Sequence, residues 1–292
     1  MLKNVTDPSA VVIDGRATVR RARNLQQIFI HIMLFALAFC TLFPFYLMVN
    51  SSFKYKMQIV DNVWFLTPPF HLDNYINAIR QISPFMLNSI IVTAGIVLGV
   101  VVVAVMAGYA FVRFDMPGGN LLFFLIISLM MIPSFLLLLP QFVLVNKMGL
   151  LNTYAVQILP PIGALAPMAV LLARTYFASL STSLFEAASI DGAGELRILL
   201  SVVVPLSMPV IATIAVIDSL AGWNNFIWPL MTASKESVKP VIIALQGIMN
   251  NTQNEQGVQL AGYVAASIPL LLFFLLATKQ FVSGLSSGAI KA

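Results

Sequence analysis

The sequence contains few charged residues. Asp, Glu, Lys and Arg make up only 9% of its 292 residues, whereas a soluble domain has about 25%. Hydrophobic residues make up 59% of the chain, and the mean hydropathy is +0.92. A chain of this composition would expose large contiguous apolar patches if it folded in water, and soluble monomers avoid such patches. The composition argues against a soluble enzyme, a disordered protein and a coiled coil, and it indicates a protein of the lipid bilayer.

Two further absences narrow the class. Cys40 is the single cysteine, which excludes an intramolecular disulfide and a cysteine-rich metal site. The dipeptide Gly-Lys does not occur, so the chain has no phosphate-binding loop of the GxxxxGKS/T type. If ATP drives the function of this chain, a different polypeptide binds the ATP. The net charge of +5 is too small to indicate nucleic-acid binding.

Long uncharged stretches dominate the chain. A helix needs about 20 apolar residues to cross about 30 Å of hydrocarbon. Stretches of at least this length between consecutive charged residues are 24–53, 81–112, 116–146, 148–173, 198–217 and 256–278. We therefore predict an all-α integral membrane protein with six transmembrane helices.

A seventh uncharged stretch, residues 219–234, is shorter. It includes Asn224, Asn225 and Pro229, and buried amides or a missing backbone donor cost free energy in lipid. We interpret it as an interfacial or re-entrant extension of the fifth helix, and a seventh span is the alternative.

The basic residues predict the orientation. With the N-terminus inside, ten Lys and Arg residues fall in cytoplasmic segments and six fall outside, as the positive-inside rule favours. Both termini are then cytoplasmic. The predicted divisions are an N-terminal tail 1–27, a six-span domain 28–281 with a cytoplasmic loop 181–200 and an outer loop 222–258, and a C-terminal tail 282–292.

The six stretches contain no Asp, Glu, Lys or Arg, because charged residues delimit them. Proton relays and ion paths usually need an ionisable group at membrane depth. This absence argues against a cation-coupled secondary carrier. A membrane enzyme is also disfavoured, since no catalytic groups cluster along the chain.

The cytoplasmic loop before the fifth span has helix signals. Ser183 and Glu186 have the spacing of a capping box, Gly192 suits a left-handed helix end, and a second helix is predicted from about Gly194. The first helix has an apolar surface formed by Leu184, Phe185, Ala188 and Ile190. Such a helix either docks in a groove of another protein or lies on the membrane surface.

This loop resembles a known motif. Glu186-Ala187-Ala188, three residues, Gly192, nine residues and then residues 202–205 (VVVP) resemble the EAA-x3-G-x9-I-x-L-P loop of binding-protein-dependent ABC importer permeases. Valines replace the usual isoleucine and leucine. Residues 190–193 (IDGA), 223–230 (WNNFIWPL) and 279–292 resemble the carbohydrate-uptake, MalG-like branch of these permeases.

The resemblance implies two contacts with an ATP-binding subunit. The coupling loop would make the first through Glu186, Ala187, Ala188, Asp191 and Gly192. The C-terminal tail would make the second through Ser286, Ser287 and Gly288.

The resemblance also implies contacts outside the membrane and along the substrate path. In the outer loop, Asn250, Asn251, Gln253 and Asn254 would reach into a docked binding protein, although a solvated loop has the same composition. Trp223, Asn224 and Asn225 are candidates for the sugar path. Trp223 and Trp228 would equally suit an interfacial aromatic belt.

We therefore expect a multi-pass permease subunit of a bacterial inner-membrane ABC importer for a sugar or oligosaccharide. It is not expected to be an enzyme or to hold a metal or cofactor, and ATP and Mg would bind to the partner ATPase. Expected partners are two ATP-binding subunits, a second permease that is a related but different chain, a solute-binding protein and membrane lipid, but no nucleic acid. The alternatives are an ABC permease for a non-sugar solute and a cation-coupled carrier.

Overall fold

The computed structural model describes residues 8–251 and 256–289, with side chains for residues 26–247 and 256–278. In this part of the chain all regular structure is helical. The elements are α1 (Pro8–Ser52), α2 (Lys56–Asp61), α3 (Asp73–Arg113), α4 (Gly119–Ser128), η1 (Leu129–Met131), α5 (Ser134–Lys147), α6 (Tyr154–Phe177), α7 (Thr182–Ile190), α8 (Glu195–Ile198), η2 (Leu199–Val203), α9 (Val204–Leu206), α10 (Met208–Trp223), α11 (Ile227–Thr232), η3 (Glu236–Val238), α12 (Val241–Asn251) and α13 (Gln256–Ala289).

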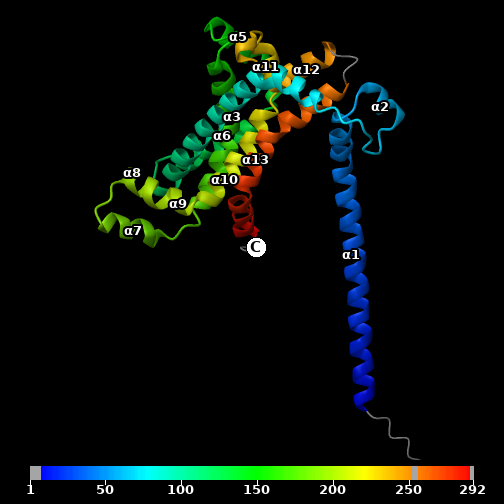
Figure 1. Ribbon diagram of the computed structural model, residues 1–292. Coiled ribbons are helices and arrows are strands. Elements are labelled where there is room, and N and C mark those ends of the chain that lie inside the picture. Colours follow the sequence, from blue (N-terminus) through cyan, green and yellow to red (C-terminus); the bar gives the residue numbers. More distant parts are fainter. Residues whose placement is uncertain (1–7, 252–255, 290–292) are drawn as a thin grey trace, which may run out of the picture.

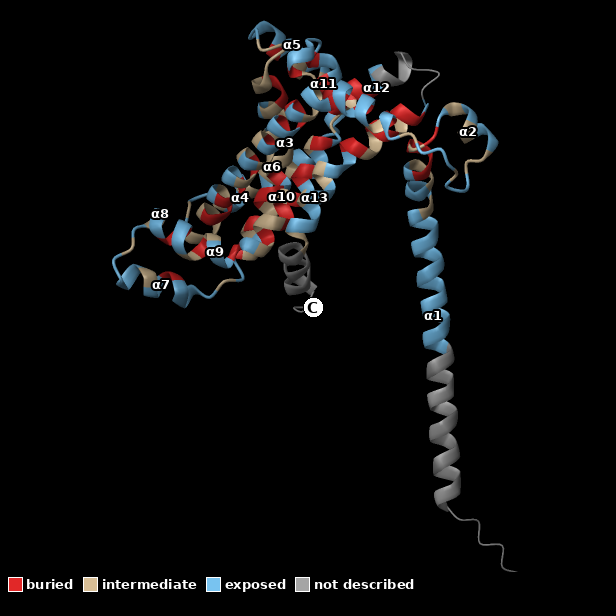
Figure 2. Cartoon of the chain, viewed as in Figure 1, coloured by how far each residue is buried: buried red, intermediate tan, exposed pale blue. Residues whose placement is uncertain are grey.

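The core is a bundle in which α3, α6, α10 and α13 pack along one another (Figure 1). The short helices α7, α8 and α9 lie at one end of this bundle, and α5, α11 and α12 lie at the other. We call these the α7 end and the α11 end. Helix α1 stands away from the bundle and contacts α13, and most of its described apolar side chains are exposed (Figure 2).

The number of apolar helices agrees with the prediction of six spans. Four helices are long and apolar enough to cross a membrane, namely residues 26–52 of α1, α3, α6 and residues 256–278 of α13. Two bent helix pairs raise the number to six if each pair is one span. The short helix α11 follows α10 after a break, so the stretch 219–234 holds no seventh span.

The third and fifth spans are bent, which the uncharged stretches did not reveal. The first bend, of 97°, separates η1 from α5. There Ile132 is extended, as a residue before proline prefers, and Pro133 interrupts the helix. The second bend, of 78°, lies at Ser207 between Pro205 and Pro209, two residues that cannot donate a backbone hydrogen bond.

Asp218 corrects one prediction. Helix α10 continues past the expected end of the fifth span to Trp223, so Asp218 lies inside this helix and is only 4% exposed. Its Oδ2 atom has no hydrogen-bond partner in the described part of the chain. The prediction that the spans contain no ionisable group is therefore wrong. The predicted spans were defined as stretches between charged residues, so a charged residue inside a transmembrane helix was taken as the end of the span.

Glycines on α3 allow α6 to approach closely. A Cβ atom at Gly95 would lie 2.7 Å from Ile158 Cδ1, and one at Gly99 would lie 2.2 Å from Ile162 Cδ1. At Gly108 the obstacle includes the backbone of α6, since a Cβ would lie 3.0 Å from the Arg174 nitrogen. Because these three glycines have no side chain, α3 and α6 can pack closely against each other.

Replacing Gly108 with alanine tests this packing. The added Cβ would lie 2.9 Å from Ala173 Cβ and close to the α6 backbone, which cannot rotate away. Overpacking of this kind costs roughly 1–3 kcal/mol, so Gly108→Ala is expected to lower the thermal unfolding midpoint of the purified protein in detergent. Gly163→Ala is the matched control, because a Cβ there meets nothing within 4 Å. Equal midpoints for the two variants would contradict the proposed role of Gly108.

Candidate functional site

The loop at the α7 end is a helix–turn–helix. Helix α7 is followed by Asp191 and by Gly192, whose φ of +75° is the left-handed conformation predicted for it. Gly194 then precedes α8, as expected. The chain continues through the π-helical turn η2 into α9 and α10.

The two faces of α7 have different environments. Phe185 is only 6% exposed and belongs to the main core of the bundle, and Ala188 packs against this core. The predicted contact residues Glu186, Ala187, Asp191 and Gly192 are exposed. One face of α7 therefore holds the helix to the bundle, while the predicted contact residues other than Ala188 remain accessible.

The predicted apolar surface and capping box need correction. Of the four apolar residues, Phe185 and Ala188 pack on the bundle, whereas Leu184 and Ile190 are exposed, Ile190 by 85%. The N-cap is Ser181 rather than Ser183, and it makes no side-chain cap bond. With Ser181 as the N-cap, the third helical residue is Leu184, so Glu186 lies outside any capping box. The hydroxyls of Ser181 and Ser183 hydrogen-bond to each other at 2.7 Å.

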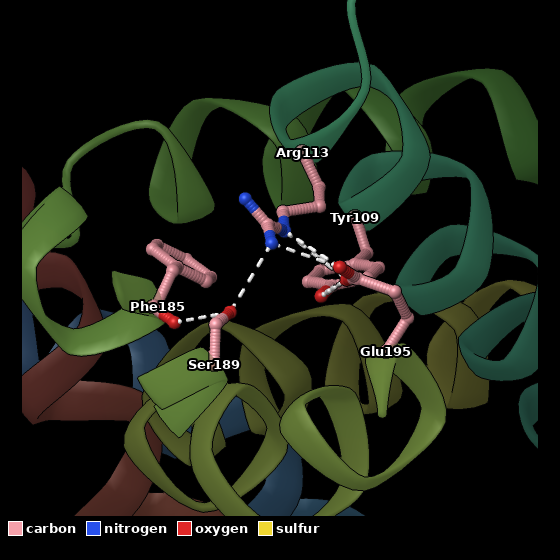
Figure 3. A network of polar contacts seen from close by, with 5 residues as sticks. All are labelled: Tyr109, Arg113, Phe185, Ser189 and Glu195. Carbon is pink, nitrogen blue, oxygen red and sulfur yellow. Dashed lines mark hydrogen bonds and ion pairs between the residues drawn. The ribbon is translucent and has the colours of Figure 1, made fainter. Parts of the chain in front are cut away.

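A polar network links this loop to the end of α3 (Figure 3). Arg113 Nη2 donates to Glu195 Oε1 at 2.8 Å, and Arg113 Nε donates to Glu195 Oε2 at 3.1 Å. The Tyr109 hydroxyl also donates to Glu195 Oε2. On α7, Ser189 Oγ accepts from Arg113 Nη2 at 3.4 Å and donates to the Phe185 carbonyl.

Sequence reasoning missed this network. Arg113 contributed only to the charge count, and Glu195 carried no role. The two residues are 82 positions apart, and no local pattern pairs them. One signal could have paired them. Arg113 ends a predicted span and Glu195 begins a predicted cytoplasmic helix, so both residues are predicted at the same face of the membrane.

A cavity of about 670 Å³ lies at the α11 end, between α5, α6, α10 and α11. Asn224 and Asn225 line it, as does Gln141, which the sequence analysis did not single out. Amides can donate to and accept from hydroxyl groups. The remaining lining is largely apolar and includes prolines 160 and 161 of α6.

The two tryptophans of this segment are core residues. Trp223 is 8% exposed and packs among Ile82, Val241 and Leu245, and it does not line the cavity. Trp228 is 4% exposed, and its indole nitrogen donates to the Val156 carbonyl at 2.7 Å. The aromatic-belt interpretation is therefore wrong for both, and only the two asparagines of the predicted path face the cavity.

The segment predicted as the outer loop, residues 222–258, is held by more specific contacts than its composition indicated. Gln157 and Asn88 donate to the carbonyls of Val238 and Lys239 at 2.7 and 3.0 Å. Helix α12 then packs Val241 and Leu245 into the core. The predicted residues Asn250 and Asn251 end this helix, their side chains are outside the described ones, and Gln253 and Asn254 lie outside the described residues.

The predicted C-terminal contact lies in the last turns of α13. This helix extends to Ala289 and thus includes Ser286, Ser287 and Gly288, whose side chains are outside the described ones. The C-terminal end of α13 and the start of α1 point toward the same side of the view as α7 (Figure 1).

Comparison with known proteins shows which family the chain belongs to. Residues 95–285 match the model of the family described as binding-protein-dependent transport system inner membrane component. The chain is 30% identical to the probable ABC transporter permease protein YurM of Bacillus subtilis, over 96% of this chain and 93% of YurM. It is 32% identical to the arabinooligosaccharides transport system permease protein AraQ of Halalkalibacterium halodurans, over 87% of this chain and 93% of AraQ.

A solved structure has the same fold. It is a chain of a bacterial ABC transporter involved in the import of the acidic polysaccharide alginate, with a TM-score of 0.76. The likeness covers 89% of this chain and 98% of that chain, at 23% sequence identity. This protein is thus a multi-pass inner-membrane permease of the ABC importer class, and it belongs to the family of binding-protein-dependent transport system inner membrane components.

Proposed function

We propose that this permease carries a sugar or oligosaccharide and is driven, through α7, by an ATP-binding subunit that is a separate polypeptide. The exposed face of α7 is the observation that supports coupling to an ATP-binding subunit. Glu186 and Ala187 are accessible while Phe185 fixes the opposite face to the bundle. A helix that is held on one side and free on the other can receive a push and transmit it.

The proposed cycle is alternating access. ATP and Mg bind to two ATP-binding subunits, which close, and α7 follows the cleft in which it sits. The bundle then opens toward a solute-binding protein, and ATP hydrolysis resets it. In this proposal α7 and both termini are cytoplasmic, and a second, related permease completes the path for the sugar.

The sugar assignment rests on the cavity and on the relatives. Gln141, Asn224 and Asn225 offer paired donors and acceptors beside apolar surface, a combination that suits a ring bearing hydroxyl groups. AraQ is named for arabinooligosaccharides, and the alginate transporter imports an acidic polysaccharide. Trp223 has no part in this path, because it is buried elsewhere.

Asp218 weakens one argument against a cation-coupled carrier, since an ionisable group does lie within a span. Family membership nevertheless favours ATP-driven import. Uptake into vesicles under an ion gradient, without any ATP-binding subunit, would overturn the proposal.

Charge reversal on the exposed face of α7 tests the drive. Glu186→Lys replaces an anion at the proposed contact with a cation. A surface of the partner that suits the anion would then face a like charge, and placing like charges together at an interface costs several kcal/mol. Uptake into proteoliposomes is expected to fall by roughly tenfold or more, and less ATP-binding subunit should co-purify. Asp115→Lys is the control, because Asp115 is an exposed acid in the α3–α4 connection, outside α7. Normal uptake by Glu186→Lys would refute the coupling role of α7.

The cavity amides can be tested individually. Gln141→Ala and Asn225→Ala each remove hydrogen bonds to a passing sugar, worth about 1 kcal/mol apiece. The maximal uptake rate should fall by roughly fivefold, measured over a panel of neutral and acidic oligosaccharides. Asn146→Ala is the matched variant, since Asn146 is an exposed amide of α5 outside the cavity. If all three variants behave alike, the cavity is not the sugar path.

The C-terminal contact is tested by truncation. Removing residues 286–292 deletes the proposed contact with the ATP-binding subunits, so stimulation of ATP hydrolysis by the loaded binding protein should decrease. Removing only residues 290–292 retains Ser286, Ser287 and Gly288 and serves as the control. An undiminished response in the longer deletion would show that these residues make no such contact.

A further inference from the structure

The chain offers an indirect path from α7 to the fifth span. After α8 it passes through the π-helical turn η2 and then bends by 78° at Ser207 before α10. Pro205 and Pro209 flank this bend and remove backbone hydrogen bonds. A displacement of α7 can therefore be absorbed by this segment before it reaches α10.

A second path runs through side chains to α3. Arg113 is the last residue of α3, and its guanidinium binds both carboxylate oxygens of Glu195 on α8. The same guanidinium contacts Ser189 on α7. Tyr109, one helical turn earlier, donates to Glu195 and lies 6.4 Å from the Phe185 ring between centroids. Figure 3 shows Arg113 between the two helices of the loop.

The exposure of Arg113 and Glu195 indicates that this ion pair orients the loop on α3 more than it stabilises the fold. The side chains of Arg113 and Glu195 are 31% and 42% exposed, and ion pairs this exposed add little to the free energy of unfolding. A two-pronged arginine–carboxylate contact nevertheless fixes the relative orientation of its partners. Tyr109, by contrast, is only 4% exposed and anchors the network in the core.

Helix α3 extends the path to the cavity. It packs along α6 at Gly95, Gly99 and Gly108, so the two helices form a closely fitted pair. Near the α11 end, a Cβ at Gly222 would lie within 3.5 Å of Thr93 and Ile96 on α3, and Gly222 lines the cavity. Movement of α3 would therefore shift Gly222, one residue of the cavity lining.

We propose that Arg113 and Glu195 form a joint that rigidly connects the coupling loop to α3, so that motion of the ATP-binding subunit enters the bundle through α3. This inference rests on the proposed function. Both are positioning residues. They fix how α7 and α8 sit on α3, and they touch neither ATP nor sugar.

The test follows the cavity in the intact complex without a sugar. Asn225→Cys is introduced with Cys40→Ser, which removes the single native cysteine, and its reaction with a water-soluble maleimide is timed with and without a non-hydrolysable ATP analogue. The analogue should change the rate by about tenfold. With Arg113→Gln or Glu195→Gln added, the change should disappear, while co-purification of the ATP-binding subunit and its basal ATP hydrolysis persist.

Two further variants exclude a merely structural effect. The exchange Arg113→Glu with Glu195→Arg restores an opposite-charge pair and should restore the response to the analogue. Arg174→Gln removes another arginine toward the same end of the bundle, one that lies over the Phe123 ring, and should keep the response within about twofold of the parent. Unfolding midpoints in detergent identify any variant that fails to fold.

The outcomes distinguish the joint from the proposed function. A full response in both Arg113→Gln and Glu195→Gln, alongside loss of uptake in Glu186→Lys, would overturn the joint and leave the drive through α7 intact. Failure of the exchange variant to recover, with its fold preserved, would also overturn the joint. Normal uptake by Glu186→Lys would instead overturn the proposed function on which the joint depends.

Discussion

The close approach of α3 to α6 is the constraint on which the bundle depends. In lipid, apolar side chains gain little by leaving one apolar surrounding for another, so helices associate through van der Waals contact at short range. Gly95, Gly99 and Gly108 provide that contact by leaving space for side chains and backbone of α6. Helices α10, α12 and α13 also contact α3, which makes α3 the central element of the fold.

The two ends of the bundle have different chemistry as a consequence. At the α7 end, α3 presents Tyr109 and Arg113 to a short loop that is otherwise held by Phe185. At the α11 end, α3 supports Gly222 beside a cavity lined by amides and apolar side chains. Helix α3 thus lies against the loop on which the ATP-binding subunit is proposed to act and against Gly222, which lines the proposed path. A rigid element of this kind suits the transmission of motion between distant sites.

Several features were predictable because they depend on local chemistry. The number of apolar helices follows from the length needed to span lipid, and the left-handed Gly192 follows from its place after a helix. The prolines of the spans tend to kink helices, but they did not by themselves single out the bends at Pro133 and Ser207, because a proline kinks or breaks a helix only where its surroundings allow it. Prolines 160, 161 and 167 lie inside the continuous helix α6.

By itself, the sequence determined that the protein is helical, lies in the membrane and has an exposed loop with a family-specific spacing, since these follow from composition and from residues close together in the chain. Only the tertiary structure decided that Arg113 meets Glu195 across 82 residues, that Asp218 is buried, and that Trp223 packs in the core while Asn225 lines the cavity. The physical reason is that a residue's partners and exposure depend on how the helices pack. The sequence of a single helix does not show which of its faces another helix will cover.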